Sequence, residues 1–103
     1  MSMESATHAV RARLLDFTGL GYRVAFEIGD EGSITIDASG TTPEIVEDAG
    51  GDEDADCVIK LSMENFEKLI AGTLNPTLAY TLGKLKIEGS MGIAMKVAAL
   101  LEE

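Results

Sequence analysis

The residues best suited to nucleophilic chemistry are one cysteine and one histidine, Cys57 and His8. A thiol becomes an effective nucleophile when a base such as imidazole lies within hydrogen-bond reach. Cys57 opens the apolar run CVIKL, whereas His8 lies near Arg11 in a predicted N-terminal helix. This context favours a buried, small apolar side chain for Cys57 and an exposed one for His8. We therefore expect no catalytic pair and no enzymatic activity, and one cysteine with one histidine is too few for a zinc site.

Three aspartates at alternate positions have the spacing of calcium ligands. Asp52, Asp54 and Asp56 would occupy positions 1, 3 and 5 of an EF-hand loop. That loop needs glycine at position 6 and glutamate at position 12, where this chain has Cys57 and Met63. A strand is also predicted to follow, where an EF-hand has a helix. The pattern favours a solvated acidic loop, so we expect no metal site and no cofactor.

The remaining carboxylates and glycines form no recognised catalytic or phosphate-binding motif. The acidic side chains gather in loops, where nothing supplies the desolvation that raises the pKa of a catalytic acid. Gly83, Gly89 and Gly92 match neither a Walker loop nor a dinucleotide fingerprint. GSMG at 89–92 has the spacing of one RNA-binding loop, but its flanks are not basic. These glycines are predicted to serve turns and helix caps.

Composition limits the classes of partner. The chain has 103 residues and a net charge of −10, with all of the excess negative charge in residues 1–56. Nucleic-acid binding and polybasic docking on an anionic membrane both need a basic footprint, so we expect neither. There is no apolar run of about 20 residues that predicts a transmembrane helix, and no secretory signal pattern. A single cysteine fits a reducing compartment, so we expect one cytoplasmic domain over residues 1–103.

The spacing of apolar residues predicts an α+β domain. Strands are expected at 22–28, around Ile34 and Ile36, briefly within 44–56, at 57–61 and at 84–88. Helices are expected at 8–18, from Ser62 to Gly72, from Asn75 to Gly83, and from Ser90 onward. This order predicts one mainly antiparallel sheet with helices packed on one face.

The predicted last helix is too apolar for an ordinary surface helix. Residues 90–101 read SMGIAMKVAALL, in which only Lys96 is charged. A surface helix keeps a polar face opposite its apolar stripe, so this helix must be buried against something. Periodicity leaves three interpretations open: a compact core, a cavity for an apolar ligand, and a dimer interface. Met63, Met91 and Met95 suit adaptable apolar spaces.

The second half of the chain carries an ordered set of motifs that is more specific than any one of them. After Ala55-Asp56-Cys57 come an amphipathic helix ending at Gly72, then Leu74-Asn75-Pro76, Gly83-Lys84-Leu85-Lys86-Ile87 and Gly89-x-Met91-Gly92-x-Ala94-Met95-Lys96. This order and spacing resemble the sterol-binding domain family of the type-2 sterol carrier proteins. The upstream hairpin matches that family more loosely.

The resemblance implies a curved, mainly antiparallel sheet of about five strands, covered by helices, with an apolar tunnel between sheet and helices. It implies non-covalent binding of a fatty acid, acyl-CoA, phospholipid or sterol-like ligand, without a metal or redox cofactor. The residues expected to line the tunnel are Phe26, Ile34, Phe66, Ile70, Leu74, Leu78, Leu82, Leu85, Met91, Met95 and Leu100.

The resemblance is to a bacterial stand-alone member of the family. The chain ends Leu101-Glu102-Glu103 without a peroxisomal tripeptide, and it is acidic where animal carriers tend to be basic. Its N-terminal helix is short, and Thr77 stands where a polar side chain such as glutamine is expected. The expected function is carriage of lipid by a monomer, or its presentation to a lipid-metabolising enzyme. The alternative is an interaction or accessory module whose last helix docks on a partner or dimerises.

Overall fold

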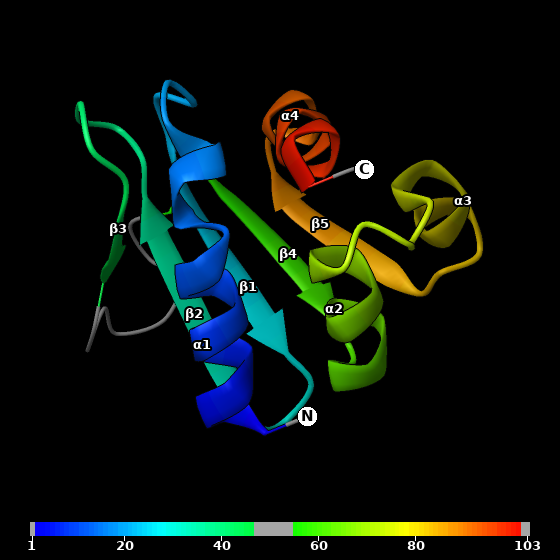
Figure 1. The fold of residues 1–103 in the computed structure, drawn as a ribbon. Coiled ribbons are helices and arrows are strands. Elements are labelled where there is room, and N and C mark those ends of the chain that lie inside the picture. Colours follow the sequence, from blue (N-terminus) through cyan, green and yellow to red (C-terminus); the bar gives the residue numbers. More distant parts are fainter. Residues whose placement is uncertain (1, 47–54, 102–103) are drawn as a thin grey trace.

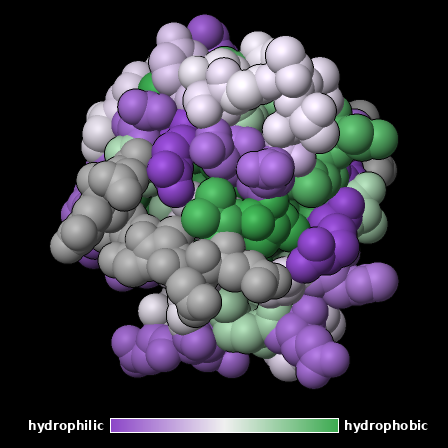
Figure 2. All heavy atoms as spheres, turned by 90° about the vertical axis from the view of Figure 1, so that its left-hand side faces the viewer, coloured by the Kyte–Doolittle hydropathy of each residue, from purple (hydrophilic) through white to green (hydrophobic). Residues whose placement is uncertain are grey.

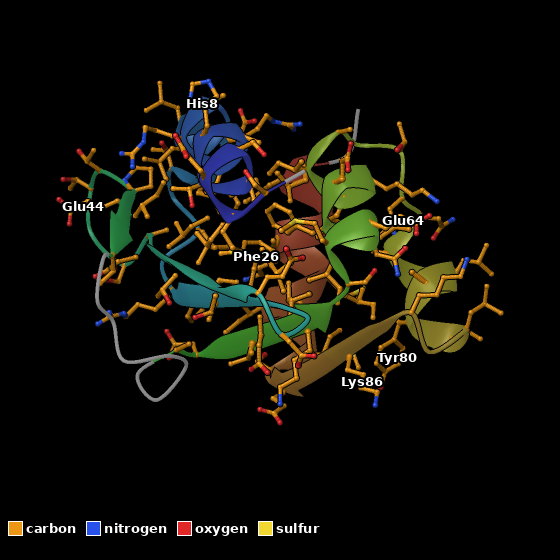
Figure 3. The ribbon with its side chains drawn as sticks, turned by 90° about the horizontal axis from the view of Figure 1, so that it is seen from below. His8, Phe26, Glu44, Glu64, Tyr80 and Lys86 are labelled. Atoms are coloured by element: carbon orange, nitrogen blue, oxygen red, sulfur yellow. The ribbon has the colours of Figure 1, made fainter. Side chains whose placement is uncertain are left out.

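The computed structural model describes residues 2–46 and 55–101, which form a five-stranded sheet with helices on one face (Figures 1 and 3). The elements in chain order are α1 (Met3–Ala12), the 3-10 helix η1 (Leu14–Phe17), β1 (Arg23–Ile28), β2 (Gly32–Asp37), β3 (Glu44–Val46), β4 (Cys57–Leu61), α2 (Met63–Ile70), α3 (Pro76–Thr81), β5 (Leu85–Gly89) and α4 (Met91–Leu101). The predicted α+β class and element order are confirmed, including the short strand after residue 43.

The sheet is mixed but mainly antiparallel. Its strand order is β3-β2-β1-β4-β5, and β1 and β4 form the parallel pair. The other three pairings are antiparallel. The parallel pair arises because the chain leaves β3 at one edge and re-enters beside β1, so that β4 runs in the direction of β1. The topology also places β3 and β5 at opposite edges.

The alternation in β1 places its large apolar residues on the helix-covered face. Val24, Phe26 and Ile28 are fully buried, and the register sets Phe26 opposite Ile34 on one side and Ile59 on the other. Side chains two apart on a strand share a face, so one row of apolar side chains crosses three strands. At the β3 edge, Ile45 and Val46 are only half-buried, and apolar side chains reach the surface there (Figure 2).

The N-terminal helix differs from its prediction over 8–18. The observed helix α1 starts at Met3, and the chain tightens into η1 from Leu14. The start is set by a capping box in which the Ser2 hydroxyl accepts from the Ser5 N–H and the Ser5 hydroxyl accepts from the Ser2 N–H. Serine in place of the usual glutamate made this box hard to recognise from sequence.

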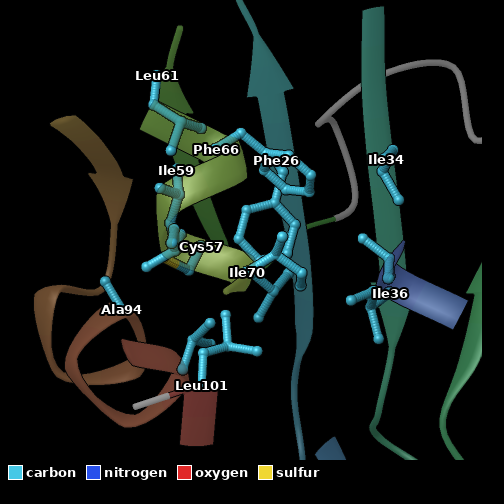
Figure 4. Close-up of a cluster of buried hydrophobic side chains, with 14 of the residues drawn as sticks. Phe26, Ile34, Ile36, Cys57, Ile59, Leu61, Phe66, Ile70, Ala94 and Leu101 are labelled. Carbon is cyan, nitrogen blue, oxygen red and sulfur yellow. The ribbon is translucent and has the colours of Figure 1, made fainter. Parts of the chain in front are cut away.

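The core lies between the sheet and helices α1, α2 and α4 (Figure 4). Phe26 and Phe66 pack edge to face at its centre, with ring centroids 5.5 Å apart and an interplanar angle of 70°. Such a pair stabilises by about 0.5–1.5 kcal/mol beyond its burial. Val97 and Leu101 bring α4 into the same cluster.

Among the described residues, no helix has both the length and the apolar character needed to cross a membrane.

Candidate functional site

Five of the eleven residues predicted to contact lipid are part of the packed core. They come from strands β1, β2 and β5 and helix α2, and each is at most 6% exposed: Phe26, Ile34, Phe66, Ile70 and Leu85. The structure therefore brings these five together from segments that are far apart in the sequence. In the described form their side chains contact other core residues.

The other six predicted residues are not sealed into the core, and all six lie between the end of α2 and the end of α4. Leu74, Met95 and Leu100 are half-buried, whereas Leu78, Leu82 and Met91 are 54%, 60% and 40% exposed. We call these six residues the outer apolar group. Their position divides the predicted site into a buried part and a part at the surface.

The short length of α3 explains why Leu78 and Leu82 are exposed. Asn75 caps this six-residue helix by accepting a hydrogen bond from the Leu78 N–H at 3.0 Å, and Pro76 occupies its first turn. Gly83 follows with φ +76°, which a residue without a side chain adopts at no steric cost. Only Ala79 of α3 is buried. Leu78 and Leu82, one turn apart, therefore remain on a flank of the helix.

Four surface pockets bounded by described residues have volumes of about 580, 460, 390 and 320 Å³. Of the eleven predicted residues, only Leu100 lines one of these four. That pocket, of about 390 Å³, lies between the η1–β1 loop and α4. Leu20 and Ala99 form part of its apolar wall, and Lys96 also lines it. The tunnel between sheet and helices stays a prediction.

Cys57 is buried in the sheet, as expected, and His8 is exposed on α1. Burial, and secondarily the negative charge of Asp56, raise the pKa of the Cys57 thiol to about 11. The thiol is therefore protonated at neutral pH, and a protonated thiol is a poor nucleophile. The geometry provides no activated cysteine.

No group of metal-ligating side chains gathers within the described parts of the chain. The Asp56 carboxylate instead accepts a hydrogen bond from the Arg23 N–H at 2.9 Å, which fixes the start of β4 against β1. Asp52 and Asp54 of the calcium-like pattern lie outside the described residues.

One residue that sequence reasoning missed is Arg13, at the C-terminal end of α1. Its guanidinium donates to the Ile70 carbonyl at 2.8 Å and to the Leu101 carbonyl at 3.2 Å, and it pairs with Asp16 at 2.7 Å. Arg13 thereby links the C-terminal ends of α2 and α4, where a cation also interacts favourably with the helix dipoles. The carbonyl partners are 57 and 88 residues away in sequence, so no local signal could have revealed them.

Comparison with known proteins adds a family match over nearly the whole chain. A model described as the SCP-2 sterol transfer family matches residues 4–102. The chain is 41% identical over 51 residues to hydroxysteroid dehydrogenase-like protein 2 of Bos taurus, covering 50% of this chain and 12% of that protein. It is 36% identical over 72 residues to sterol carrier protein 2 of Rattus norvegicus, covering 70% of this chain and 13% of that protein. The chain thus spans only a small part of these relatives.

A solved structure supports the fold. Palmitated SCP2L2 of Aedes aegypti superposes with a TM-score of 0.63 at 18% identity, covering 100% of this chain and 96% of that one. At this low sequence identity, the superposition shows that the two chains share a fold.

Proposed function

Because this chain belongs to the SCP-2 sterol transfer family, we propose that it carries one lipid molecule at a time in the cytoplasm. The family is a lipid-binding, non-catalytic module, although some relatives are much longer proteins with the names of enzymes. The proposed ligand is a fatty acid or another lipid with an acyl-sized apolar chain, held non-covalently. The protein carries it as a monomer, and a lipid-metabolising enzyme is the proposed recipient.

The observation that carries this proposal is the outer apolar group. Isolated exposed leucines are common on protein surfaces, but a concentration of large exposed apolar side chains marks a binding surface. Leu78 and Leu82 are exposed one helical turn apart at α3, and half-buried Leu74 and Leu100 pack against the core. An apolar ligand chain would cover the exposed side chains.

We propose that the ligand enters where α3 meets the core. Helix α3 is held by one buried side chain, Ala79, by the Asn75 cap and by its packing against β5. Displacing it would expose little apolar surface and would open a path toward Leu85, Phe66 and Ile70. Phe26 and Ile34, deeper on the sheet, would then form the inner end of the site.

The size of the site fits a carrier. Helix α4 has 11 residues, and a helix of that length spans about 16 Å, the scale of a lipid tail. Burying about ten methylenes contributes about 8 kcal/mol. The free-energy costs of association and of ordering the ligand offset several kcal/mol of this gain. The expected affinity is therefore micromolar or weaker, which allows release of the ligand. The palmitate named with the Aedes aegypti protein supports fatty acid as the first ligand to test.

Native mass spectrometry of freshly purified protein, with organic extraction of bound material, tests the proposal. We expect monomer carrying fatty acid or phospholipid at up to one molecule per chain, and uptake of added palmitate by any empty fraction. Empty protein that takes up neither palmitate nor phospholipid would contradict it. An empty dimer would favour the interaction module with α4 at its interface.

A further inference from the structure

One guanidinium group links η1, α2 and α4. Arg13 is the C-cap of α1, and its Nη1 donates to the carbonyl of Ile70, the last residue of α2, at 2.8 Å. Its Nη2 donates to the carbonyl of Leu101, the last residue of α4, at 3.2 Å, and its Nε donates to the Asp16 carboxylate on η1 at 2.7 Å. The side chain of Arg13 is 22% exposed, so these contacts are largely shielded from water.

The two helix carbonyls depend on a partner from outside their helices, because the last four C=O groups of a helix have no partner within it. Arginine suits this position, since its planar fork presents several N–H donors at once. Apart from Lys96, which lies over the Tyr22 ring at 5.5 Å, α4 has no polar side chain. The polar attachment of the C-terminal end of α4 is therefore made through its backbone, which Arg13 holds.

The residues that Arg13 holds border the proposed lipid site. Ile70 is itself one of the predicted lipid contacts, and Leu101 directly follows another, Leu100. Ile70 and Leu101 are 6% and 1% exposed and belong to the packed cluster around Phe26 (Figure 4). Helices α2 and α4 are therefore two walls of the proposed site, and Arg13 fixes the C-terminal end of each.

This cluster has to open before an acyl chain can occupy it. Phe26 and Phe66 are fully buried and pack edge to face, and close-packed protein interiors contain few voids larger than a water molecule. Displacing α3 opens a path toward the cluster, but room inside it requires α2 and α4 to move apart. That movement breaks the hydrogen bonds by which Arg13 spans the two helices.

We propose that Arg13 is a latch that regulates the lipid site. It holds α2 and α4 together in the ligand-free protein, and its hydrogen bonds to Ile70 and Leu101 break when a lipid spreads the two helices. The latch presupposes the proposed carriage of lipid, and Arg13 is a positioning residue because it acts through the helices. Lipid binds the open form, so the observed dissociation constant is the intrinsic one divided by the open fraction. A latch therefore lowers the affinity and favours release, which a carrier requires.

A latch and a direct contact with the ligand predict opposite results for the same substitution. If Arg13 paired with the carboxylate of a fatty acid, its removal would weaken palmitate binding, since charge-assisted hydrogen bonds would be lost. If Arg13 is a latch, its removal raises the open fraction and strengthens palmitate binding. A purely structural role predicts a lower free energy of unfolding without a selective gain in binding.

The test is palmitate binding by R13Q and R13K, measured by equilibrium titration and by stopped-flow uptake. Both variants should bind palmitate more tightly and take it up faster. R13Q should gain roughly tenfold in apparent affinity, because losing charged hydrogen bonds shifts a two-state equilibrium by about that factor. R13K lacks the planar fork and should gain roughly threefold. Because R13K keeps the charge, its gain is independent of electrostatics and stays measurable if R13Q folds poorly.

Two controls separate the latch from charge and from a general loss of stability. R11Q removes the same charge from an exposed position on α1 and should bind palmitate like the unmodified protein. I36V trims a fully buried side chain on β2, outside both helices, and should lose stability without a gain in binding. Amide exchange without lipid should accelerate selectively at the last turns of α2 and α4 in R13Q, and not in I36V.

Three results would overturn the latch: palmitate binding by R13Q and R13K that is no tighter than that of the unmodified protein, an equal gain in R11Q or I36V, or unchanged amide exchange at the ends of α2 and α4 in R13Q. The carriage of lipid fails in a different way, through absence of palmitate and phospholipid uptake by the unmodified protein and every variant. Tighter binding by R13Q and R13K, with none in R11Q or I36V, would support both proposals.

Discussion

Helices α2 and α3 begin with similar cap signals but are packed very differently. Ser62 caps α2 and Asn75 caps α3, each accepting from a backbone N–H three residues later. Helix α2 buries three large apolar residues, with Phe66 at 0% exposure, whereas α3 buries only Ala79 and leaves Leu78 54% exposed. The difference shows that apolar content and helix signals do not determine depth in the fold.

The contrast also shows which part of the molecule can move at low cost. Helix α2 is held by the Phe66–Phe26 contact and, at its C-terminal end, by the Arg13 hydrogen bond. Helix α3 has one buried side chain and a packing partner in β5. Regions with few buried apolar contacts open at low free energy. The proposed entry for a ligand therefore lies on the α3 side.

The largest predicted difference is between substitutions in these two helices. Phe66→Ala should lower the free energy of unfolding by about 3–5 kcal/mol, because it leaves a cavity beside Phe26. Leu78→Ala, the matched control, should change it by less than about 0.5 kcal/mol because more than half of that side chain is in solvent. Urea unfolding followed by circular dichroism measures both. Comparable losses would show that α3 is as firmly packed as α2.

Alkaline pH should lower the free energy of unfolding, because Cys57 is buried in the packed core as a neutral thiol. Because the pKa of Cys57 is raised from 9.0 to about 11 in the folded protein, the unfolded chain ionises first. The contribution of the protonated Cys57 thiol to the free energy of unfolding is therefore complete below pH 9. As pH rises toward 11 this contribution is lost, and the free energy of unfolding falls by roughly 2–3 kcal/mol. Urea unfolding across this range should show that loss in the unmodified protein beyond any seen in Cys57→Ala. Parallel pH profiles would place Cys57 in a less buried environment.

Removing the Arg13 guanidinium should loosen the ends of α2 and α4. Arg13→Gln loses donors to the Ile70 and Leu101 carbonyls, and charged hydrogen bonds of this kind stabilise by about 1–3 kcal/mol. Arg11→Gln is the control, since it removes the same charge at an exposed position on α1. Urea unfolding and amide exchange at the last turn of α4 measure the effect. Equal stability of the two variants would mean that the observed hydrogen bonds contribute nothing.

A small stability change is also predicted for Met95→Trp, at a half-buried member of the outer apolar group. If α3 yields as proposed, tryptophan fills the ligand space, blocks palmitate uptake and costs less than about 1 kcal/mol. A tightly packed site would instead lose about 1–3 kcal/mol through overpacking. Palmitate titration and urea unfolding of the same variant distinguish these outcomes. Full palmitate binding by a strongly destabilised variant would contradict the proposed site.

Most of the fold could be predicted because its signals are local. Alternation in β1, the Ser62 and Asn75 caps and the glycines that end α2 and α3 each act over a few residues. The start of α1 was missed because its capping box uses Ser5 where glutamate is usual. The parallel pairing of β1 with β4 depends on where the chain re-enters the sheet, which no local pattern specifies.

The candidate site was predicted as one group of eleven residues, and the structure divides it. Phe66 and Leu78 are both large, apolar and correctly spaced on their helices, so sequence reasoning gave them the same role. One is fully buried and the other is 54% exposed. Burial depends on what packs against a helix, and that is decided by segments distant in sequence.

By itself the sequence determined the family, the α+β class, the caps and the apolar composition of the last helix, because spacing and cap chemistry act within a few residues. Only the tertiary structure decided that Arg13 joins two helix ends, that α3 remains shallow, and that β3 and β5 are the opposite edges of the sheet. Each of these depends on contacts or distances between residues far apart in the chain, which strand order and helix packing set together.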